Sequence, residues 1–316
     1  MSQNTENPFA FTDSNKRYHT YDYYLRTTYG QKCAKIPLDI GCTCPNIDGR
    51  CGAYGCIYCS PRGSGDFAAA GSVSTQIEAA RAALGEKWKT ARIIPYFQAH
   101  TNTYGDLDVL ARAYEEALAA EGVVGLHIAT RADCLPDEIL RVLADLAGKT
   151  VLTVELGLQT AFDETAAAIG RGHTFADFTA GYRALREASD KIRIGVHLIN
   201  GLPGETPEMM LESAAAVAAL DPDLVKIHEL YVLENTRLAD LYRAGRYTPM
   251  DEETFIEVTA NQLTRLPPRT VIGRLTGDGN ARQTLAPRHE KGKISILNGI
   301  DRYLFLHDLW QGKYRK

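Results

Sequence analysis

The chain has 316 residues, of which 45% are apolar, and a formal net charge of −4 at pH 7. This composition can form one large core or two modest ones, and no apolar run is long enough to span a membrane. The first twenty residues are polar and lack the apolar segment of a secretory signal, so we expect a soluble, cytoplasmic protein. The negative net charge disfavours a protein that binds nucleic acid through bulk charge alone.

Six apolar stretches rich in β-branched residues predict strands. Their near-continuous apolar character is typical of strands covered on both faces, as in a parallel sheet. The stretches cover Ile36–Ile40, Arg92–Phe97, Gly125–Thr130, Val151–Leu158, Ile192–Ile199 and Leu224–Leu233. Helical patterns separate them. Thr75 with Glu78 predicts a capping box, Asp106 predicts a second helix cap, and Thr206 precedes a helix that opens on Pro207.

These alternating units predict an α/β fold, a partial (β/α)6 barrel of the TIM type, with an open doubly wound sheet as the alternative. After residue 250 the pattern changes to one helix, the pair Pro267-Pro268 and a basic segment rich in glycine and proline. We therefore expect a barrel over residues 1–250, with a cysteine-rich loop at 42–62, and a C-terminal basic extension over 251–316 that packs on the barrel.

The charges are distributed unevenly along the chain. From residue 265 onward there are eleven lysines and arginines against four acidic residues, so the preceding part is strongly acidic. Such asymmetry can mark an end of the molecule that faces a polyanion. It fits equally well a solvated tail that balances an acidic body.

Polar side chains recur within or just after the predicted strands. In both candidate topologies, ligands bind at the carboxyl ends of parallel strands, so these side chains predict a binding site there. The residues are Gln98, His100, Asn102, Thr130, Arg131, Glu155, Gln159, His197, Asn200, His228 and Glu229.

Five of the seven cysteines fall within eighteen residues after the first predicted strand. Cys56 and Cys59 form a CxxC pair, whose spacing lets both thiols reach one metal centre. In a reducing compartment, such clustered thiols favour metal binding over structural disulfides. Four thiolates would form a closed zinc site, to which Cys42 or Cys51 could contribute, whereas three thiolates could hold an iron–sulfur cluster with one open iron.

Several longer motifs carry a resemblance to a known family. They include PLDIGCTCPNIDG…GCIYCSPRGSGDF, YFQAHTNTYG, IATRADCLPDEIL, VELGLQTAFDETAAAIGRGHT, HLINGLPGET, KIHELYVLENT and RLTGDG. With these motifs the chain resembles the YhcC-like family of radical S-adenosylmethionine (SAM) proteins, which is itself similar to the radical SAM domain of the elongator complex's catalytic subunit. The likeness extends from about residue 18 to the C-terminus.

The resemblance implies a [4Fe-4S] cluster on Cys44, Cys56 and Cys59, with Cys42 and Cys51 as competitors for the first position. It implies reductive cleavage of S-adenosylmethionine to a 5′-deoxyadenosyl radical. The residues expected around that cofactor are Tyr58, Gln98, Glu155, Gln159, Arg171, His197 and Gly201. On the substrate side we expect His100, Asn102, His228 and Glu229.

The resemblance to the elongator subunit and the basic C-terminal segment predict a radical SAM enzyme that modifies RNA, such as the wobble uridine of tRNA. Its electron donor would be a flavodoxin or a ferredoxin. Two alternatives remain at this point: a radical SAM enzyme that acts on a small metabolite, and a zinc-dependent nucleic-acid-binding module without enzymatic activity.

Overall fold

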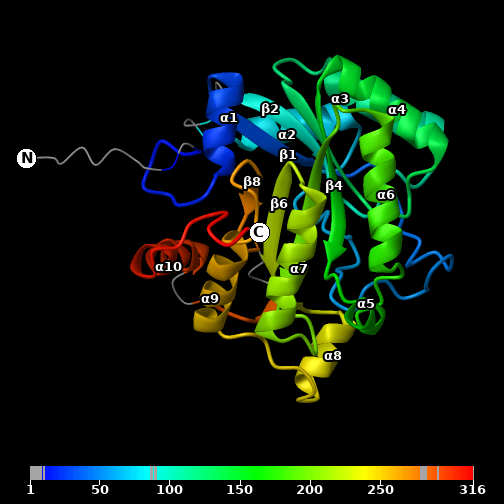
Figure 1. Cartoon of the computed structure of the whole chain (residues 1–316). Helices are drawn as coiled ribbons and strands as arrows, with labels where there is room; N and C mark the ends of the chain where they lie inside the picture. Colours follow the sequence, from blue (N-terminus) through cyan, green and yellow to red (C-terminus); the bar gives the residue numbers. More distant parts are fainter. Residues whose placement is uncertain are drawn as a thin grey trace, which may run out of the picture.

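The computed structural model describes residues 9, 11–85, 88, 91–277, 283–289 and 292–315. Its centre is a parallel sheet of seven strands in the order β1-β2-β3-β4-β5-β6-β8. The strands are β1 (Cys33–Leu38), β2 (Arg92–Phe97), β3 (Gly125–Thr130), β4 (Val151–Gln159), β5 (Arg193–Asn200), β6 (Leu224–Glu229) and β8 (Val271–Arg274). The sheet curls into a half-barrel (Figure 1), which confirms the predicted α/β partial barrel.

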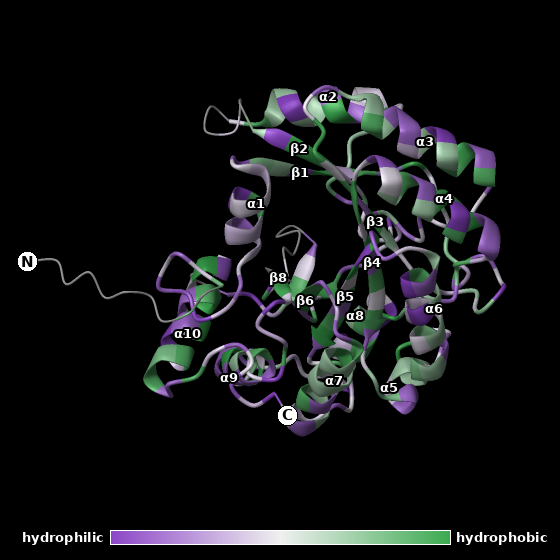
Figure 2. Ribbon diagram, turned by 45° about the horizontal axis from the view of Figure 1, so that its top comes forward, coloured by the Kyte–Doolittle hydropathy of each residue, from purple (hydrophilic) through white to green (hydrophobic). Residues whose placement is uncertain are grey.

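Helices cover the outer face of the curled sheet, as the hydropathy-coloured view shows (Figure 2). They are α2 (Val73–Ala83), α3 (Leu107–Ala119), α4 (Asp137–Lys149), α5 (Asp163–Ala168), α6 (Phe175–Ala188), α7 (Pro207–Leu220), α8 (Arg237–Arg243), α9 (Glu252–Leu263) and α10 (Gly292–Leu306). Helix α1 (Tyr21–Tyr29) contacts both edge strands, β1 and β8. It therefore lies at the opening between the two edges of the half-barrel. None of the described helices is long and apolar enough to cross a membrane.

Two of the three predicted helix caps are confirmed. The side chains of Asp106 and Thr206 each accept a hydrogen bond from a backbone N–H in the first turn of α3 and α7. The predicted box at Thr75 is wrong. Ser72 caps α2 instead and accepts the Thr75 N–H, because the helix begins two residues earlier, at Val73.

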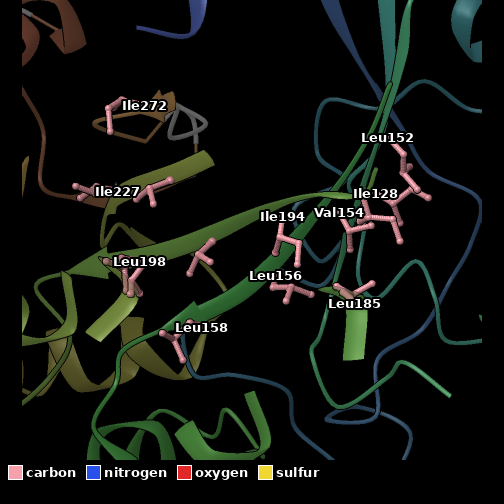
Figure 3. Close-up of a cluster of buried hydrophobic side chains, with 14 of the residues drawn as sticks. Ile128, Leu152, Val154, Leu156, Leu158, Leu185, Ile194, Leu198, Ile227 and Ile272 are labelled. Atoms are coloured by element: carbon pink, nitrogen blue, oxygen red, sulfur yellow. The ribbon is translucent and has the colours of Figure 1, made fainter. Parts of the chain in front are cut away.

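The core follows from the two-residue period of the strands. Alternate side chains such as Ile128, Val154, Leu156, Leu198 and Ile227 are buried in one hydrophobic cluster (Figure 3). The remaining positions face the inside of the half-barrel, and several of them are polar, as described below.

The C-terminal segment completes the sheet in a way that the sequence did not predict. Strand β8 lies beyond residue 250 and pairs parallel with β6. The predicted strand Leu224–Leu233 is divided: β6 ends at Glu229, and β7 (Val232–Leu233) pairs antiparallel with β9 (Thr284–Ala286). The division of the chain at residue 250 stays a prediction. Of the basic extension, Arg282, Lys291 and Lys316 lie outside the described residues.

Candidate functional site

A cavity of about 550 Å³ lies inside the half-barrel. Its walls come from every strand of the curled sheet except β3, from α1 and from the cysteine loop. Seven side chains predicted from the sequence meet there: Tyr58, Cys59, Gln98, Gln159, His197, His228 and Glu229. The cysteine loop follows β1 and therefore lies at the carboxyl ends of the strands, where the barrel architecture predicts ligand binding.

The cysteine loop is fastened to the segment that precedes α6. Asn46 donates from Nδ2 to the carbonyl oxygens of Gly170 and Arg171, both at 2.8 Å, and to Cys56 Sγ at 3.4 Å. The Ile57 N–H donates to the Ile169 carbonyl at 3.0 Å. Two motifs separated by more than a hundred residues thus form one structural unit around Cys56.

Glycine is required at position 172 of this unit. Gly172 has φ +79°, and a Cβ there would lie 2.3 Å from Asn46 Oδ1. That distance is far below van der Waals contact, so any side chain would displace the loop.

The three predicted cluster ligands are electrostatically coupled. Burial, and then the neighbouring Cys56 and Cys44, raise the pKa of the Cys59 thiol to about 12, whereas the nearby Arg171 guanidinium lowers it. A thiol with such a pKa keeps its proton at neutral pH unless a metal takes the proton's place. Three neighbouring thiols fit a [4Fe-4S] cluster, in which three irons would each bind one cysteine and the fourth iron would stay open.

The competing cysteines have different surroundings. Cys42 packs against the main hydrophobic core, and burial raises the pKa of its thiol to about 12. Cys51 is exposed. These surroundings do not separate ligands from bystanders, because burial also raises the pKa of the Cys59 thiol to about 12, so Cys44 as the first ligand stays a prediction.

Within the described residues, no group of three or more histidines, cysteines, aspartates or glutamates is arranged to hold a metal ion. A tetrahedral zinc site needs sulfurs only about 3.8 Å apart, since each Zn–S bond is about 2.3 Å long. A cubane is wider than one ion and needs no such convergence.

A bulge in β4 directs Gln159 into the cavity. The register between β4 and β5 shifts between Gly157 and Gln159, and Gln159 has φ +76°. The Arg171 guanidinium donates from Nε to the Gly157 carbonyl at 3.1 Å. Bulges of this kind re-aim side chains beside active sites. Arg171 itself is buried and does not line the cavity, so its expected place beside the cofactor stays a prediction.

Glu155 lies in the middle of the half-barrel with 0% of its side chain exposed. Its Oε1 accepts from Lys35 Nζ at 2.5 Å and lies 2.5 Å from His127 Nδ1. Its Oε2 accepts from the Tyr96 hydroxyl at 3.0 Å and lies 2.7 Å from His197 Nε2. The Lys226 ammonium also donates to Oε2. The expected contact of this carboxylate with the cofactor stays a prediction, because both oxygens are already bonded within the protein.

The surrounding charges set the protonation of this network. Burial and the two lysines lower the pKa of His127 to about 3 and of His197 to about 4. Burial opposes ionisation of Glu155, but Lys226 and Lys35 hold the pKa of its carboxyl well below the usual range. Both histidines are therefore neutral at pH 7, and Glu155 is ionised.

Besides Cys44, Cys56, Glu155 and Arg171, three further predicted site residues do not line the cavity. The His100 ring packs against Gly63, directly after the cysteine loop. The contact is so close that a Cβ on Gly63 would lie 2.3 Å from His100 Nδ1. Asn102 is fully buried and donates to the carbonyls of Phe97 and Ala129. The Gly201 carbonyl accepts from the Tyr247 hydroxyl at 2.8 Å. These contacts indicate that the three residues hold loops and strands in place. Their predicted contacts with a ligand stay predictions.

Sequence reasoning missed four residues of the inner wall: Lys35, Tyr96, His127 and Lys226. Each occupies an inward position of an otherwise apolar strand, and three of them line the cavity. A lysine within a buried apolar strand needs a partner or a ligand, and this signal was available in the sequence for Lys35 and Lys226.

Family comparisons agree with the geometry. Residues 47–217 match the model of the radical SAM superfamily, and residues 222–305 match that of the radical SAM C-terminal domain. YtqA of Bacillus subtilis, an uncharacterised protein, is 41% identical over 99% of this chain and 97% of its own length. YhcC of Escherichia coli is 32% identical over 90% of this chain and 91% of its own length.

More distant relatives are partial matches. A tRNA uridine(34) acetyltransferase of Methanocaldococcus jannaschii is 33% identical over 49% of this chain and 28% of its own length. The solved structure of the archaeal Methanocaldococcus infernus Elp3 superposes with a TM-score of 0.68 at 20% identity, covering 89% of this chain and 64% of that one. At this identity the superposition shows a shared fold.

The superfamily uses a [4Fe-4S] cluster and S-adenosylmethionine, and a cavity bordered by Cys59 and Tyr58 at the carboxyl ends of a half-barrel suits both. The chain belongs to the radical SAM superfamily, in the group of proteins that includes YhcC and YtqA.

Proposed function

We propose that this protein is a cytoplasmic radical SAM enzyme that modifies tRNA. The observation that carries the enzymatic part is the cavity inside the half-barrel, which opens beside Cys59 at the end of the barrel where ligands bind. The tRNA part is supported by the partial similarity to tRNA uridine(34) acetyltransferases. This chain spans less than a third of the M. jannaschii enzyme, so acetyl transfer does not follow from the match.

Cys44, Cys56 and Cys59 would hold the cluster, and Asn46 would donate a hydrogen bond to the sulfur of Cys56. When bound, the cluster supplies the electron that cleaves S-adenosylmethionine to a 5′-deoxyadenosyl radical. The protein's part is to orient the cofactor and exclude water from the radical. Tyr58 and Gln159 line the cavity beside Cys59, where they would contact the nucleoside part of the cofactor.

The basic C-terminal segment contributes less to tRNA binding than its charge suggests. The guanidiniums of Arg269 and Arg315 both pair with the Asp221 carboxylate, which lies at the end of α7. Part of their positive charge is therefore compensated within the protein. Arg288 and Arg302 are exposed and are the better candidates for phosphate contacts in the described part of this segment.

The test is anaerobic reconstitution of the cluster, followed by incubation with labelled S-adenosylmethionine, total tRNA and reduced flavodoxin or ferredoxin. Mass spectrometry of the digested nucleosides should reveal a new modified nucleoside together with 5′-deoxyadenosine. The Cys59→Ala variant should produce neither, whereas Cys33→Ala should produce both, because Cys33 lies in β1 away from the loop.

A small-metabolite substrate is the second candidate, favoured by the cavity of about 550 Å³ inside the half-barrel. If it is correct, 5′-deoxyadenosine formation does not respond to tRNA, and neutralising Arg288 and Arg302 together leaves activity unchanged. A tRNA enzyme should instead lose affinity for tRNA in that double variant and show steep salt dependence.

A further inference from the structure

The inner wall of the cavity gathers basic side chains from three strands, and burial lowers the pKa of the two lysines among them. Lys35 and Lys226 both line the cavity, and both of their ammonium groups share the single Glu155 carboxylate. Their side chains are only 21% and 8% exposed. A buried charge without a full partner is costly, so two ammoniums on one carboxylate leave room for a further anion.

Two more groups add to this wall. Arg274 of β8 also lines the cavity. Burial most of all, and then neighbouring charges that include Arg274, lower the pKa of both Lys226 and His228. His228 lies beside His197, with ring centroids 5.2 Å apart. Its Nε2 is buried and has no hydrogen-bond partner among the described residues, although it belongs to a side chain that lines the cavity.

The other carboxylates of the cavity are engaged elsewhere. Asp66 accepts from the Ser60 hydroxyl at 2.9 Å, in the cysteine loop. Glu229 lies 2.8 Å from His289 Nε2, and His289 Nδ1 lies 3.1 Å from Glu252. Neither carboxylate makes a hydrogen bond or ion pair with Lys35 or Lys226 in the described structure.

We propose that Lys35, Lys226, Arg274 and His228 form a binding site for an oxyanion group of the substrate, a phosphate or a carboxylate. The site would hold the substrate's anionic end against the inner wall, while the cysteine loop lies at the carboxyl ends of the strands. An ammonium or guanidinium donating to an oxyanion forms a charge-assisted hydrogen bond, and the unpartnered His228 Nε2 supplies one more polar contact. The proposal depends only on the residues that line the cavity. The site could bind the anionic group of a nucleotide or of a small metabolite equally well.

The experiment measures the thermal stability of the reconstituted protein with increasing inorganic phosphate or acetate, against sodium chloride at equal ionic strength. A ligand that binds only the folded state raises the midpoint temperature. We expect phosphate, acetate or both to raise it beyond chloride, and the more effective anion identifies the chemical class. The measurement needs neither turnover nor tRNA, so its result is independent of the proposed RNA substrate.

The Lys226→Met variant should bind the effective anion about 10- to 100-fold more weakly, as expected for loss of one charge-assisted hydrogen bond. It should still fold, because Glu155 keeps Lys35 as its partner. Lys191→Met is the matched control, since Lys191 is exposed in the turn before β5 and should leave binding unchanged. Lys35→Met provides a second variant, should Lys226→Met fail to fold.

Two results would overturn the proposal. One is a reconstituted protein that neither phosphate nor acetate stabilises beyond chloride. The other is undiminished anion binding in the lysine variants. In either case the network would serve only to close the half-barrel.

Discussion

Glu155 of β4 accepts a 2.5 Å hydrogen bond from Lys35 of β1, although three strand positions separate the two residues around the sheet. Lys226 of β6 reaches the same carboxylate from the other side. The pairing exists only because the sheet curls, and it links the first strand of the half-barrel to the middle of the sheet.

Replacing Glu155 by Gln should destabilise the protein by about 3–5 kcal/mol, since two buried ammonium groups would lose their carboxylate. Urea unfolding of the purified protein measures the change. The double variant Glu155→Gln with Lys226→Met should recover part of the lost stability, because it removes one of the two ammonium groups left without a carboxylate. Equal stability of wild type and Glu155→Gln would show that the network contributes nothing to the fold.

The lowered pKa values of His127 and His197 predict that the folded protein loses stability in mild acid. Their folded pKa values, about 3 for His127 and about 4 for His197, lie below the unfolded value near 6.5. The unfolded chain therefore takes up protons first as the pH falls. The stabilisation is complete above about pH 6.5 and is lost progressively down to the folded pKa values.

Between pH 7 and pH 5 each histidine should account for about 2 kcal/mol of lost unfolding free energy. Denaturant titrations at the two pH values measure it. His197→Gln should lower stability at pH 7 but show a smaller loss on acidification than wild type. An identical loss in the variant would assign the pH dependence to other groups.

Gly172→Ala should disrupt the cysteine loop. The new Cβ would lie 2.3 Å from Asn46 Oδ1, the residue that ties the loop to the segment before α6. We expect a strongly reduced content of iron and sulfide after reconstitution. Gly204→Ala is the matched control: Gly204 also has positive φ (+85°), but nothing lies within 4 Å of its added Cβ. If both variants lost iron equally, the loss in Gly172→Ala would result from backbone strain and not from the contact with Asn46.

Single alanine variants of the loop cysteines should separate ligands from bystanders. Cys44→Ala, Cys56→Ala and Cys59→Ala should each lose the cluster and its absorbance near ~400 nm. Cys42→Ala should keep the cluster but unfold more easily, because Cys42 packs on the core. Cys51→Ala should change neither property, since Cys51 is exposed. A cluster lost in Cys51→Ala and retained in Cys44→Ala would reverse the assignment of the first ligand.

The local pattern of the sequence was sufficient to predict most strands and helix caps of this protein. Apolar stretches predicted six of the seven parallel strands, and caps such as Asp106 and Thr206 were correct because a cap depends on residues within one turn. The spacing of Cys56 and Cys59 predicted a metal-binding pair for the same reason. The seventh strand, β8, was missed because it is only four residues long and lies among glycines and prolines.

Only the tertiary structure decided what faces the cavity. The sequence could not show that Lys35, Glu155 and Lys226 meet, because their contact depends on the curl of a sheet whose strands are far apart along the chain. Local hydrogen bonds and side-chain periodicity determine elements, whereas the surroundings of a side chain depend on long-range packing. Here that packing gathers basic residues at inward positions of separate strands onto one wall of the cavity.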